Sequence, residues 1–478
     1  MFQKLINSTL ILPLLLLASL PSYSNEIELD DEINIEKILN KKNIVFEDLE
    51  SILLNKNLEI KSLKSLVDAA YFNLSSTISK RYPSIDITAT GFPQYIYGRS
   101  YNNTSADTKS SQLKANPTIT LKWDLIDPLR GPDIESAKNN YKIAKNNYEI
   151  KKLDLLQEAQ SRYHKYQKSY EDLKNAKSSV NLSEISLKDA NAKFEAGIGT
   201  KFDVLEAKAQ LARDKQLYEE RKISREISMI ALKEILNFNI ANKLSLDNNQ
   251  KLIGVWDYTL KSNLQNGIKN SYSLKNIKLQ TFIKQNQAKK FLNSNKPKVF
   301  ISNSISSSFS KGSTLSTEID PNKSSSSYTN TVSLNVSWPI FNGGKNKNSF
   351  KSKTAEANSE NFSYENLKQS IKSDISEIYL NLNKNKRKVL STAEEILSTK
   401  ESLKLARLRY EVGISTLKDV LIRQKELSNA KSKKINAIYN YNLNLNRLER
   451  LTFQNSNKKC SNNDNKNKFN SFCNFEGG

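Results

Sequence analysis

The segment Phe194-Glu-Ala-Gly-Ile-Gly-Thr-Lys-Phe-Asp-Val-Leu205 occurs a second time as Tyr410-Glu-Val-Gly-Ile-Ser-Thr-Leu-Lys-Asp-Val-Leu421. Seven of the twelve paired positions are identical, against roughly one expected from average amino-acid frequencies. Each copy has a glycine, then a threonine and, three residues after it, an aspartate, which is typical of a tight turn that leads into a capped helix. The sequence therefore predicts the same helical turn at two places.

The spacing between the two copies continues through the rest of the chain. The segments begin 216 residues apart (410 minus 194). Trp123 and Trp338 are 215 residues apart, and Leu58 and Leu274 are again 216 apart. Because self-similarity at a fixed offset is the signature of a repeated structural unit, we predict an internal two-fold repeat.

Both predicted repeats have the same order of elements: a helix, two strands, a very long helix, a turn and a final helix. Repeat 1 spans 46–238, with a helix at 46–80, strands at 84–97 and 116–126, a long helix at 131–195, the turn 196–200 and a helix at 201–238. Repeat 2 spans 266–453, with a helix at 266–293, strands at 298–310 and 328–341, a long helix at 346–411, the turn 412–416 and a helix at 417–453. A linker covers 239–265, and a polar tail, predicted to be disordered, covers 454–478.

The predicted strands have the length and pattern of membrane strands. Apolar and polar residues alternate without a break over 118–125 and again over 332–340, which places the two kinds on opposite faces of a sheet. About ten residues are enough for a tilted strand to cross the hydrocarbon layer. Trp123 and Trp338 lie at the strand ends, where an aromatic girdle would sit. The alternative is a soluble sandwich, for which four strands among so many helical residues are too few.

The first long helix is far longer than a globular domain requires. Apolar and tyrosine residues follow one stripe with a mean step of about 3.6 residues, and at 1.5 Å per residue the rod is about 95 Å long. Four membrane strands also leave two edges without hydrogen-bond partners, so the sheet must close on further copies of the chain. Two copies give a filled eight-stranded barrel and three give a twelve-stranded one with a lumen. The sequence alone does not choose between them.

Composition limits the possible partners. The formal net charge is +23 and the mean hydropathy is −0.60, but the lysines are interleaved with Glu and Asp at helical spacing, which indicates a solvated helix surface and no nucleic-acid partner. A lysine, an apolar run and small residues near Ser24 predict a signal peptide at 1–24, followed by a periplasmic segment at 25–45. Cys460 and Cys473 would reach an oxidising compartment, and whether they pair is left open.

The paired helix–strand–strand–helix plan, the segment Trp338-Pro-Ile-Phe-Asn-Gly-Gly344 and the two turns resemble the TolC-like outer membrane efflux proteins. The resemblance covers nearly all of residues 45–453. It implies an α+β membrane protein with a long α-helical hairpin barrel in the periplasm and four transmembrane β-strands per subunit, which form a 12-stranded β-barrel as a homotrimer in the outer membrane. It also implies a passive exit duct for efflux or type I secretion. The implied partners are a periplasmic adaptor and an inner-membrane RND, ABC or MFS pump.

The resemblance also assigns the expected site residues. Asp419 would line the narrow constriction and Tyr410 would help to latch it. Trp123 and Trp338 would lie at the membrane interface, and the tips that dock the adaptor would contain Gly197, Thr200, Asp203, Gly413 and Thr416. For both aspartates, helix capping is the simpler interpretation. Two positions depart from the family pattern, because a second carboxylate is replaced by Ile422 and a latching arginine by Ser415.

Catalysis is not expected. The single histidine, His164, has no companion for a triad or a metal site, and no cofactor motif is present. Two alternatives remain. An exported structural coiled-coil protein would explain the helices but not the duplicated strand pairs. A periplasmic adaptor would have one hairpin and a lipoyl-like domain.

Overall fold

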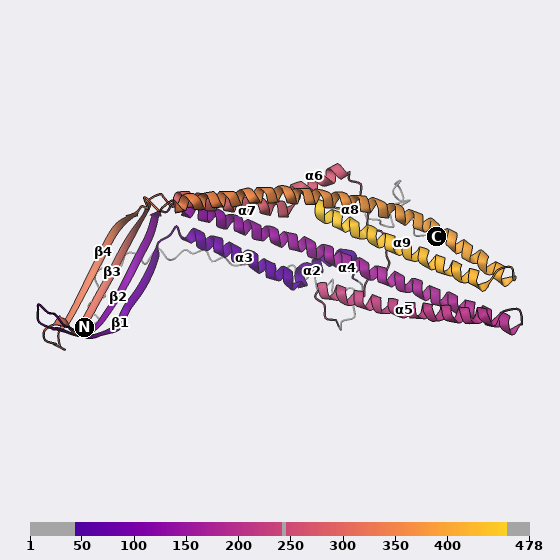
Figure 1. Cartoon of the computed structure of the whole chain (residues 1–478), viewed down its shortest axis with the longest axis horizontal. Helices are drawn as coiled ribbons and strands as arrows, with labels where there is room; N and C mark the ends of the chain where they lie inside the picture. The colour runs from indigo at the N-terminus through magenta and orange to yellow at the C-terminus, as the bar shows by residue number, and fades with distance from the viewer. Residues whose placement is uncertain (1–43, 241–244, 457–478) are drawn as a thin grey trace.

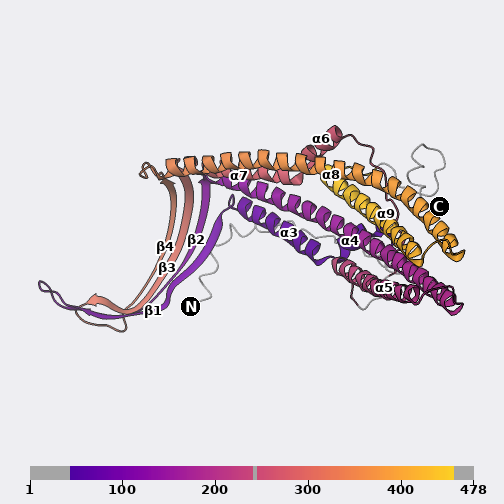
Figure 2. The same ribbon diagram turned by 45° about the vertical axis from the view of Figure 1, so that its right-hand side comes forward.

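The computed structural model describes residues 44–240 and 245–456. The predicted signal peptide, nearly all of the segment 25–45 and most of the polar tail lie outside the described residues, as do Cys460 and Cys473. The described part is elongated, with a β-sheet at one end and the turns of two helical hairpins at the other (Figure 1). Figure 2 shows that the sheet bends away from the axis of the helices.

Each half of the chain contains helices, then two strands, then two further helices. In the first half they are η2 (Phe46–Asp48), α2 (Leu49–Lys56), α3 (Leu58–Ser79), β1 (Ser84–Ser100), β2 (Thr108–Ile126), α4 (Arg130–Glu195) and α5 (Lys201–Ile235). In the second half they are α6 (Leu260–Asn270), α7 (Tyr272–Asn293), β3 (Lys298–Ser316), β4 (Ser324–Ser337), α8 (Lys345–Glu411) and α9 (Leu417–Thr452).

The first helix of each half differs from its prediction. The helix predicted over 46–80 is broken at Asn57, whose backbone is extended and whose side chain accepts hydrogen bonds from the amides of Glu59 and Ile60. The helix predicted over 266–293 begins at Tyr272, because Ser271 caps it and ends the preceding α6. Asn and Ser favour N-caps because their side chains satisfy the first free amides of a helix.

The helices form four rods that lie side by side in one curved layer. α8 packs against α7 and α9, these pack against α4, and α4 packs against α3 and α5. The shorter helices lie end to end: the Asn57 amide donates to the Ile235 carbonyl at 3.0 Å where α5 meets α3, and the rings of Tyr272 and Phe453 are 5.7 Å apart where α9 meets α7. α8 and the α3/α5 rod are therefore the two edges of the layer.

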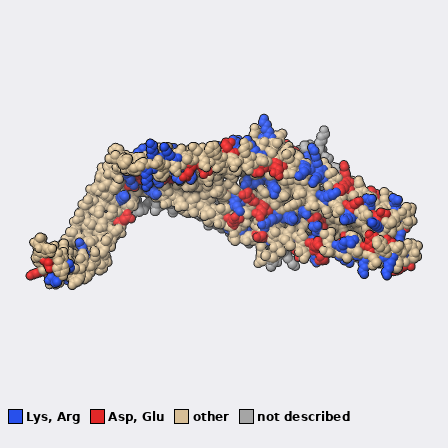
Figure 3. Space-filling model, in the orientation of Figure 1, with Lys and Arg blue, Asp and Glu red and all other residues tan. Residues whose placement is uncertain are grey.

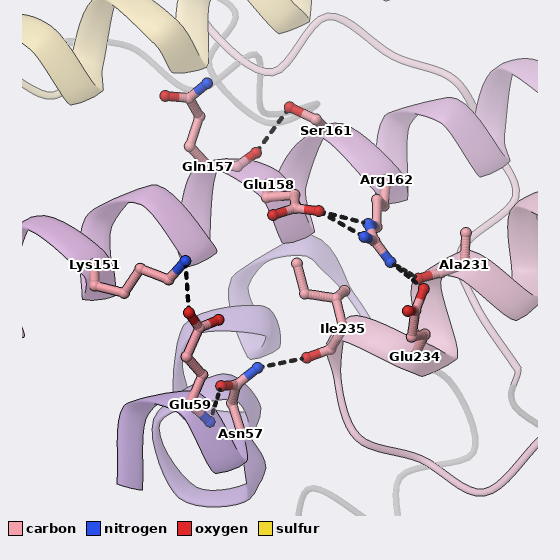
Figure 4. A network of polar contacts seen from close by, with 10 residues as sticks. All are labelled: Asn57, Glu59, Lys151, Gln157, Glu158, Ser161, Arg162, Ala231, Glu234 and Ile235. Atoms are coloured by element: carbon pink, nitrogen blue, oxygen red, sulfur yellow. Dashed lines mark hydrogen bonds and ion pairs between the residues drawn. The ribbon is translucent and has the colours of Figure 1, made fainter. Parts of the chain in front are cut away.

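Polar contacts of α4 hold the junction between α5 and α3 (Figure 4). Arg162 donates to the Ala231 carbonyl at 2.6 Å and to Glu234 at 2.8 Å, both at the end of α5. Lys151 forms an ion pair with Glu59, at the start of α3, at 2.7 Å. One long helix thus fixes two shorter ones in line.

The part of the linker that the structure describes from residue 245 onward crosses the helical layer and is bound by buried polar side chains. The Gln167 amide donates to the carbonyls of Asp247 and Asn249 at 3.2 and 2.8 Å. Asn442, which is fully buried, donates to the Lys251 carbonyl at 2.7 Å and accepts from the Ile253 amide at 3.3 Å. Apolar clusters lie beneath the two ends of this segment, so the linker is part of the packed core.

His164 belongs to this core. Its imidazole stacks on Phe46 with ring centroids 5.1 Å apart, and its Nδ1 lies 3.2 Å from the Gln167 side-chain oxygen. Burial lowers the pKa of His164 to about 4. The neutral imidazole is therefore the folded form at neutral pH.

We expect acid to destabilise the helical layer through His164. An unfolded histidine takes up a proton near pH 6.5 and the folded one only near pH 4, so stability is complete above pH 6.5 and falls as the pH drops towards 4. The full loss is about 3 kcal/mol. The melting temperature of the purified wild type should be lower at pH 5 than at pH 7.5. This difference should be smaller in His164→Phe, because phenylalanine keeps a ring against Phe46 but cannot titrate. Equal pH dependence in both proteins would contradict this assignment.

The sheet is antiparallel, with the strand order β1-β2-β3-β4. It extends further than predicted at the end away from the helices: β2 begins at Thr108 instead of 116, and β3 continues to Ser316 instead of 310. Backbone pairing continues there through serine-rich sequence, where the apolar alternation that marks a strand is lost. β4 ends at Ser337 instead of 341, because Pro339 has no amide to donate to a ladder.

Candidate functional site

Gly197, Thr200 and Asp203 lie in or next to the turn between α4 and α5. Gly197 has φ = 76°, a conformation that suits glycine because it has no Cβ. Thr200 caps α5: its hydroxyl accepts from the Asp203 amide at 3.1 Å, and the Asp203 carboxylate accepts from the Thr200 amide at 3.3 Å. This reciprocal capping box lets one helix end and the next begin within five residues.

The turn between α8 and α9 is built in the same way, with one additional contact. Gly413 has φ = 81°, and Thr416 and Asp419 form the capping box. The Ser415 hydroxyl also donates to the Asp419 carboxylate at 2.7 Å. The first turn has Gly199 at the matching position and lacks this donor. The departure from the family pattern at Ser415 thus provides a direct partner for Asp419.

The Asp419 carboxylate is stabilised in its charged form. The hydrogen bond from Ser415 and those from Thr416 lower its pKa below the usual value, and the positive charge of Arg409 adds to the effect. Ile422, in the next turn of α9, is 42% exposed and supplies no second carboxylate. Asp419 is therefore an exposed, charged carboxylate at this tip, together with Glu411 at the end of α8.

Tyr410 lies where the two hairpins meet. Lys193, in the last turn of α4, donates to the Tyr410 carbonyl and, at 3.4 Å, to the Glu411 carbonyl, and its ammonium is 4.1 Å from the centre of the Tyr410 ring. Burial raises the pKa of the Tyr410 phenol, and the carboxylates of Asp203 and Asp189 raise it further. The structure thus brings Tyr410 and Asp203 into one cluster, while Asp419 remains within its own turn.

Lys193 is the residue that the sequence interpretation missed. A lysine one residue before the repeated segment has no distinguishing pattern in a chain with 73 Lys and Arg residues. Its second-half counterpart at the same offset is Arg409, which acts on Asp419. The presence of a basic residue just before both copies of the segment is the pattern that identifies Lys193 in the sequence.

The two tryptophans lie where the sheet joins the helices. The Trp123 indole donates to the Arg81 carbonyl at 3.0 Å, and the Trp338 indole donates to the Asn295 carbonyl at 2.9 Å. Both acceptors follow the helix that leads into the sheet. The rings stay 41% and 61% exposed. Each tryptophan therefore fixes a helix–strand junction while its ring faces outward.

The register of the sheet separates apolar from polar side chains. Ile119 is paired with Ile87 on one side and with Ile305 on the other, and directly paired residues share a face. The neighbouring row, which faces the other way, consists of Asp86, Thr120, Ser304 and Thr331. One face is thus rich in Ile, Leu and Val, and the other is lined with Ser and Thr.

Charge is distributed unevenly along the molecule. On the face shown in Figure 3, Lys, Arg, Asp and Glu are mixed over the helices, whereas this face of the sheet is almost free of charge between its far end and the helix junction. No helix within residues 44–240 or 245–456 is long and apolar enough to cross a membrane. Within the same ranges, no group of three or more His, Cys, Asp or Glu side chains is placed to hold a metal ion.

Comparison with models of known protein families assigns the chain to a family. A family model described as outer membrane efflux protein matches residues 49–237 and 293–452, which is more than half of the chain. The chain belongs to the outer membrane efflux protein family. The matched ranges include both tips of this efflux protein and all of β1, β2, β3 and β4.

Several solved structures have a similar fold. This efflux-family chain is similar to the outer-membrane channel OprN (15% identity, TM-score 0.71, covering 85% of this chain and 89% of that one). It is also similar to the Campylobacter jejuni CmeC outer membrane channel (16%, 0.70, 85% and 85%) and to the Vibrio cholerae outer membrane protein VceC (13%, 0.70, 85% and 96%). At these identities the likeness shows the fold. Comparison with curated protein sequences gave no significant match.

Proposed function

We propose that the protein is the subunit of an outer membrane channel that serves as a passive exit duct from the periplasm in a tripartite efflux or type I secretion system. The observation that carries this proposal is the sheet, which has one apolar face, one Ser/Thr face and two unpaired edges at the end of a helical layer. Such a sheet suits a pore wall, with lipid on one side and water on the other. A conduit of this kind has no need of catalytic residues.

The open edges favour a closed oligomer. β1 and β4 each have a neighbour on one side only, and free edge amides and carbonyls in lipid cost several kcal/mol each. Pairing β4 of one subunit with β1 of the next removes every free edge. Three copies give twelve strands and a lumen, whereas two give eight strands whose side chains fill the interior. We therefore propose a homotrimer with a 12-stranded β-barrel.

The helical layer supports the same assembly. Large apolar side chains are exposed on both edge rods, on α8 at Phe362, Leu380, Leu397 and Leu405, and on the α3/α5 rod at Leu66, Phe72, Ile223 and Ile227. Exposed apolar surface of this extent marks an interaction surface. Contact between the two edge rods of neighbouring subunits would close the layers into a periplasmic tunnel. Gene duplication would explain why both halves supply equivalent rods and strands.

The tips are the proposed contact with a periplasmic adaptor, which would connect the tunnel to an inner-membrane RND, ABC or MFS pump. The Gly197–Asp203 and Gly413–Asp419 turns are the parts of the molecule furthest from the sheet (Figure 1). Asp419 would ring the constriction, and the Lys193–Tyr410 contact would hold it narrow. The exposed rings of Trp123 and Trp338 would lie at the periplasmic membrane interface.

The purified full-length protein, added to a planar lipid bilayer, tests the proposed function. Stepwise single-channel currents of uniform size are expected, because each inserted assembly encloses one water-filled lumen. A preparation that folds correctly, as judged by its circular dichroism, but gives no discrete currents would exclude a channel.

Ion selectivity of the same currents tests the role of Asp419. Asp419→Asn should reduce the preference for cations, because it removes the charge of a carboxylate ring at the narrowest point. Asp203→Asn is the matched control, since it disturbs the same capping box on the other hairpin. Because the hydrogen bonds of Ser415 and Thr416 lower the pKa of Asp419, wild-type selectivity should persist at pH 5. Equal reversal potentials for the wild type and Asp419→Asn would show that the Asp419 carboxylate does not line the constriction.

A further inference from the structure

A second candidate site lies far from the tips, at the level of the linker. A cavity of about 630 Å³ opens in the groove between α4 and α9, with linker residues Asn249, Gln250 and Lys251 as one wall. From α4 it is lined by Glu171 and Lys174, and from α9 by Lys431 and Lys434. A volume of this size suits a small-molecule ligand.

The lining of the cavity has excess positive charge. Lys174, Lys251, Lys431 and Lys434 face a single carboxylate, that of Glu171. Glu171 lies 3.6 Å from Lys174. Among the described residues, no carboxylate lies within 4.0 Å of the ammonium groups of Lys251, Lys431 or Lys434. The lining therefore has four ammonium groups and one carboxylate around a single cavity.

The surroundings of Lys431 illustrate the excess of positive charge in this cavity. Its side chain is partly buried, and burial lowers its pKa. The positive charges of Lys400 and Lys174 lower it further. Like charges gathered in a partly desolvated groove repel one another and attract an anion strongly.

We propose that this cavity binds a small polyvalent oxyanion, a molecule with two or more phosphate or carboxylate groups. Three ammonium groups without a carboxylate partner, contributed by α9 and by the linker, match a ligand with several negative charges better than a monovalent one. Lysine binds such groups as a point charge from a flexible stem. Because the linker supplies one wall, a bound ligand would also fasten the linker to α4 and α9.

Isothermal titration of the purified full-length protein with inorganic triphosphate tests this site, with sodium chloride of equal ionic strength as the reference. Saturable binding to the wild type is expected. The variant Lys431→Gln/Lys434→Gln should bind about tenfold more weakly or worse, because two of the charged contacts are lost. A citrate titration shows whether carboxylates serve as well as phosphates.

Two further variants distinguish binding in this cavity from a nonspecific attraction of the anion to the positively charged protein. Lys138→Gln/Lys142→Gln removes two exposed charges from α4 outside the cavity and should bind as the wild type does. Lys431→Arg/Lys434→Arg keeps the charge and should retain binding, which also shows that the positions tolerate substitution. The proposal is overturned if the wild type shows no saturable binding of either probe, or if the Gln pair binds as tightly as the wild type.

Discussion

Ile119→Arg should remove most of the heat-modifiable oligomer from the outer membrane. Ile119 lies at the centre of the apolar face, in one row with Ile87 and Ile305, and is 42% exposed in the single chain. An arginine on the lipid face near the middle of the bilayer costs about 2–4 kcal/mol, and a homo-oligomer bears this cost once per subunit. The readout is the intensity of the oligomer band on an unheated denaturing gel of outer membranes.

The neighbouring residue provides the control. Thr120 is directly opposite Asp86 and Ser304 on the polar face, so Thr120→Arg places the same side chain towards water and beside a carboxylate. Opposite charges across a strand pair are favourable, and this variant should assemble as the wild type does. If both variants assemble equally well, the assignment of the two faces to lipid and lumen is wrong.

Lys193→Met should increase the mean single-channel conductance. The substitution keeps an unbranched apolar stem but removes the ammonium that bridges to the backbone of α8 and lies over the Tyr410 ring. A hydrogen bond from a charged donor contributes about 1.5–3 kcal/mol, and partial exposure reduces this to the order of 1 kcal/mol. Such a loss shifts the equilibrium between narrow and wide tips by about fivefold.

The tip itself should remain folded in this variant. The capping boxes at Thr200 and Thr416 do not involve Lys193, so melting temperature should change little while conductance rises. Lys201→Met is a suitable control, because Lys201 is exposed in the first turn of the next helix. Unchanged conductance in Lys193→Met would mean that the contact with Tyr410 does not hold the tip.

The sequence predicts those parts of the fold that depend on local chemistry. The turns follow from Gly197, Gly413 and their Thr–Asp caps, because positive φ and capping depend on a few neighbouring residues. The C-terminal ends of α4 and α8 follow from the same turns. The breaks at Asn57 and Ser271 were missed because both caps lie inside continuous helical patterns, and the helix that completes each rod comes from elsewhere in the chain.

Features that depend on long-range contacts could not be predicted. The outer ends of β2 and β3 are polar, and only their pairing with each other identifies them as strands. Lys193 meets Tyr410 across 217 residues of sequence, and the lysines of the linker cavity come from three separate segments. The Asp419–Ser415 contact is local, but a serine four residues before an aspartate has no pattern in the sequence that distinguishes it as a hydrogen-bond donor.

Native mass spectrometry of the protein extracted from outer membranes in detergent tests the central claim most directly. This four-stranded sheet is expected to be incomplete until sister subunits extend it into a closed wall around water. The expected spectrum is dominated by a species of three chains, with twelve strands and no free edge. A stable single chain, especially one that stays in solution without detergent, would contradict the account.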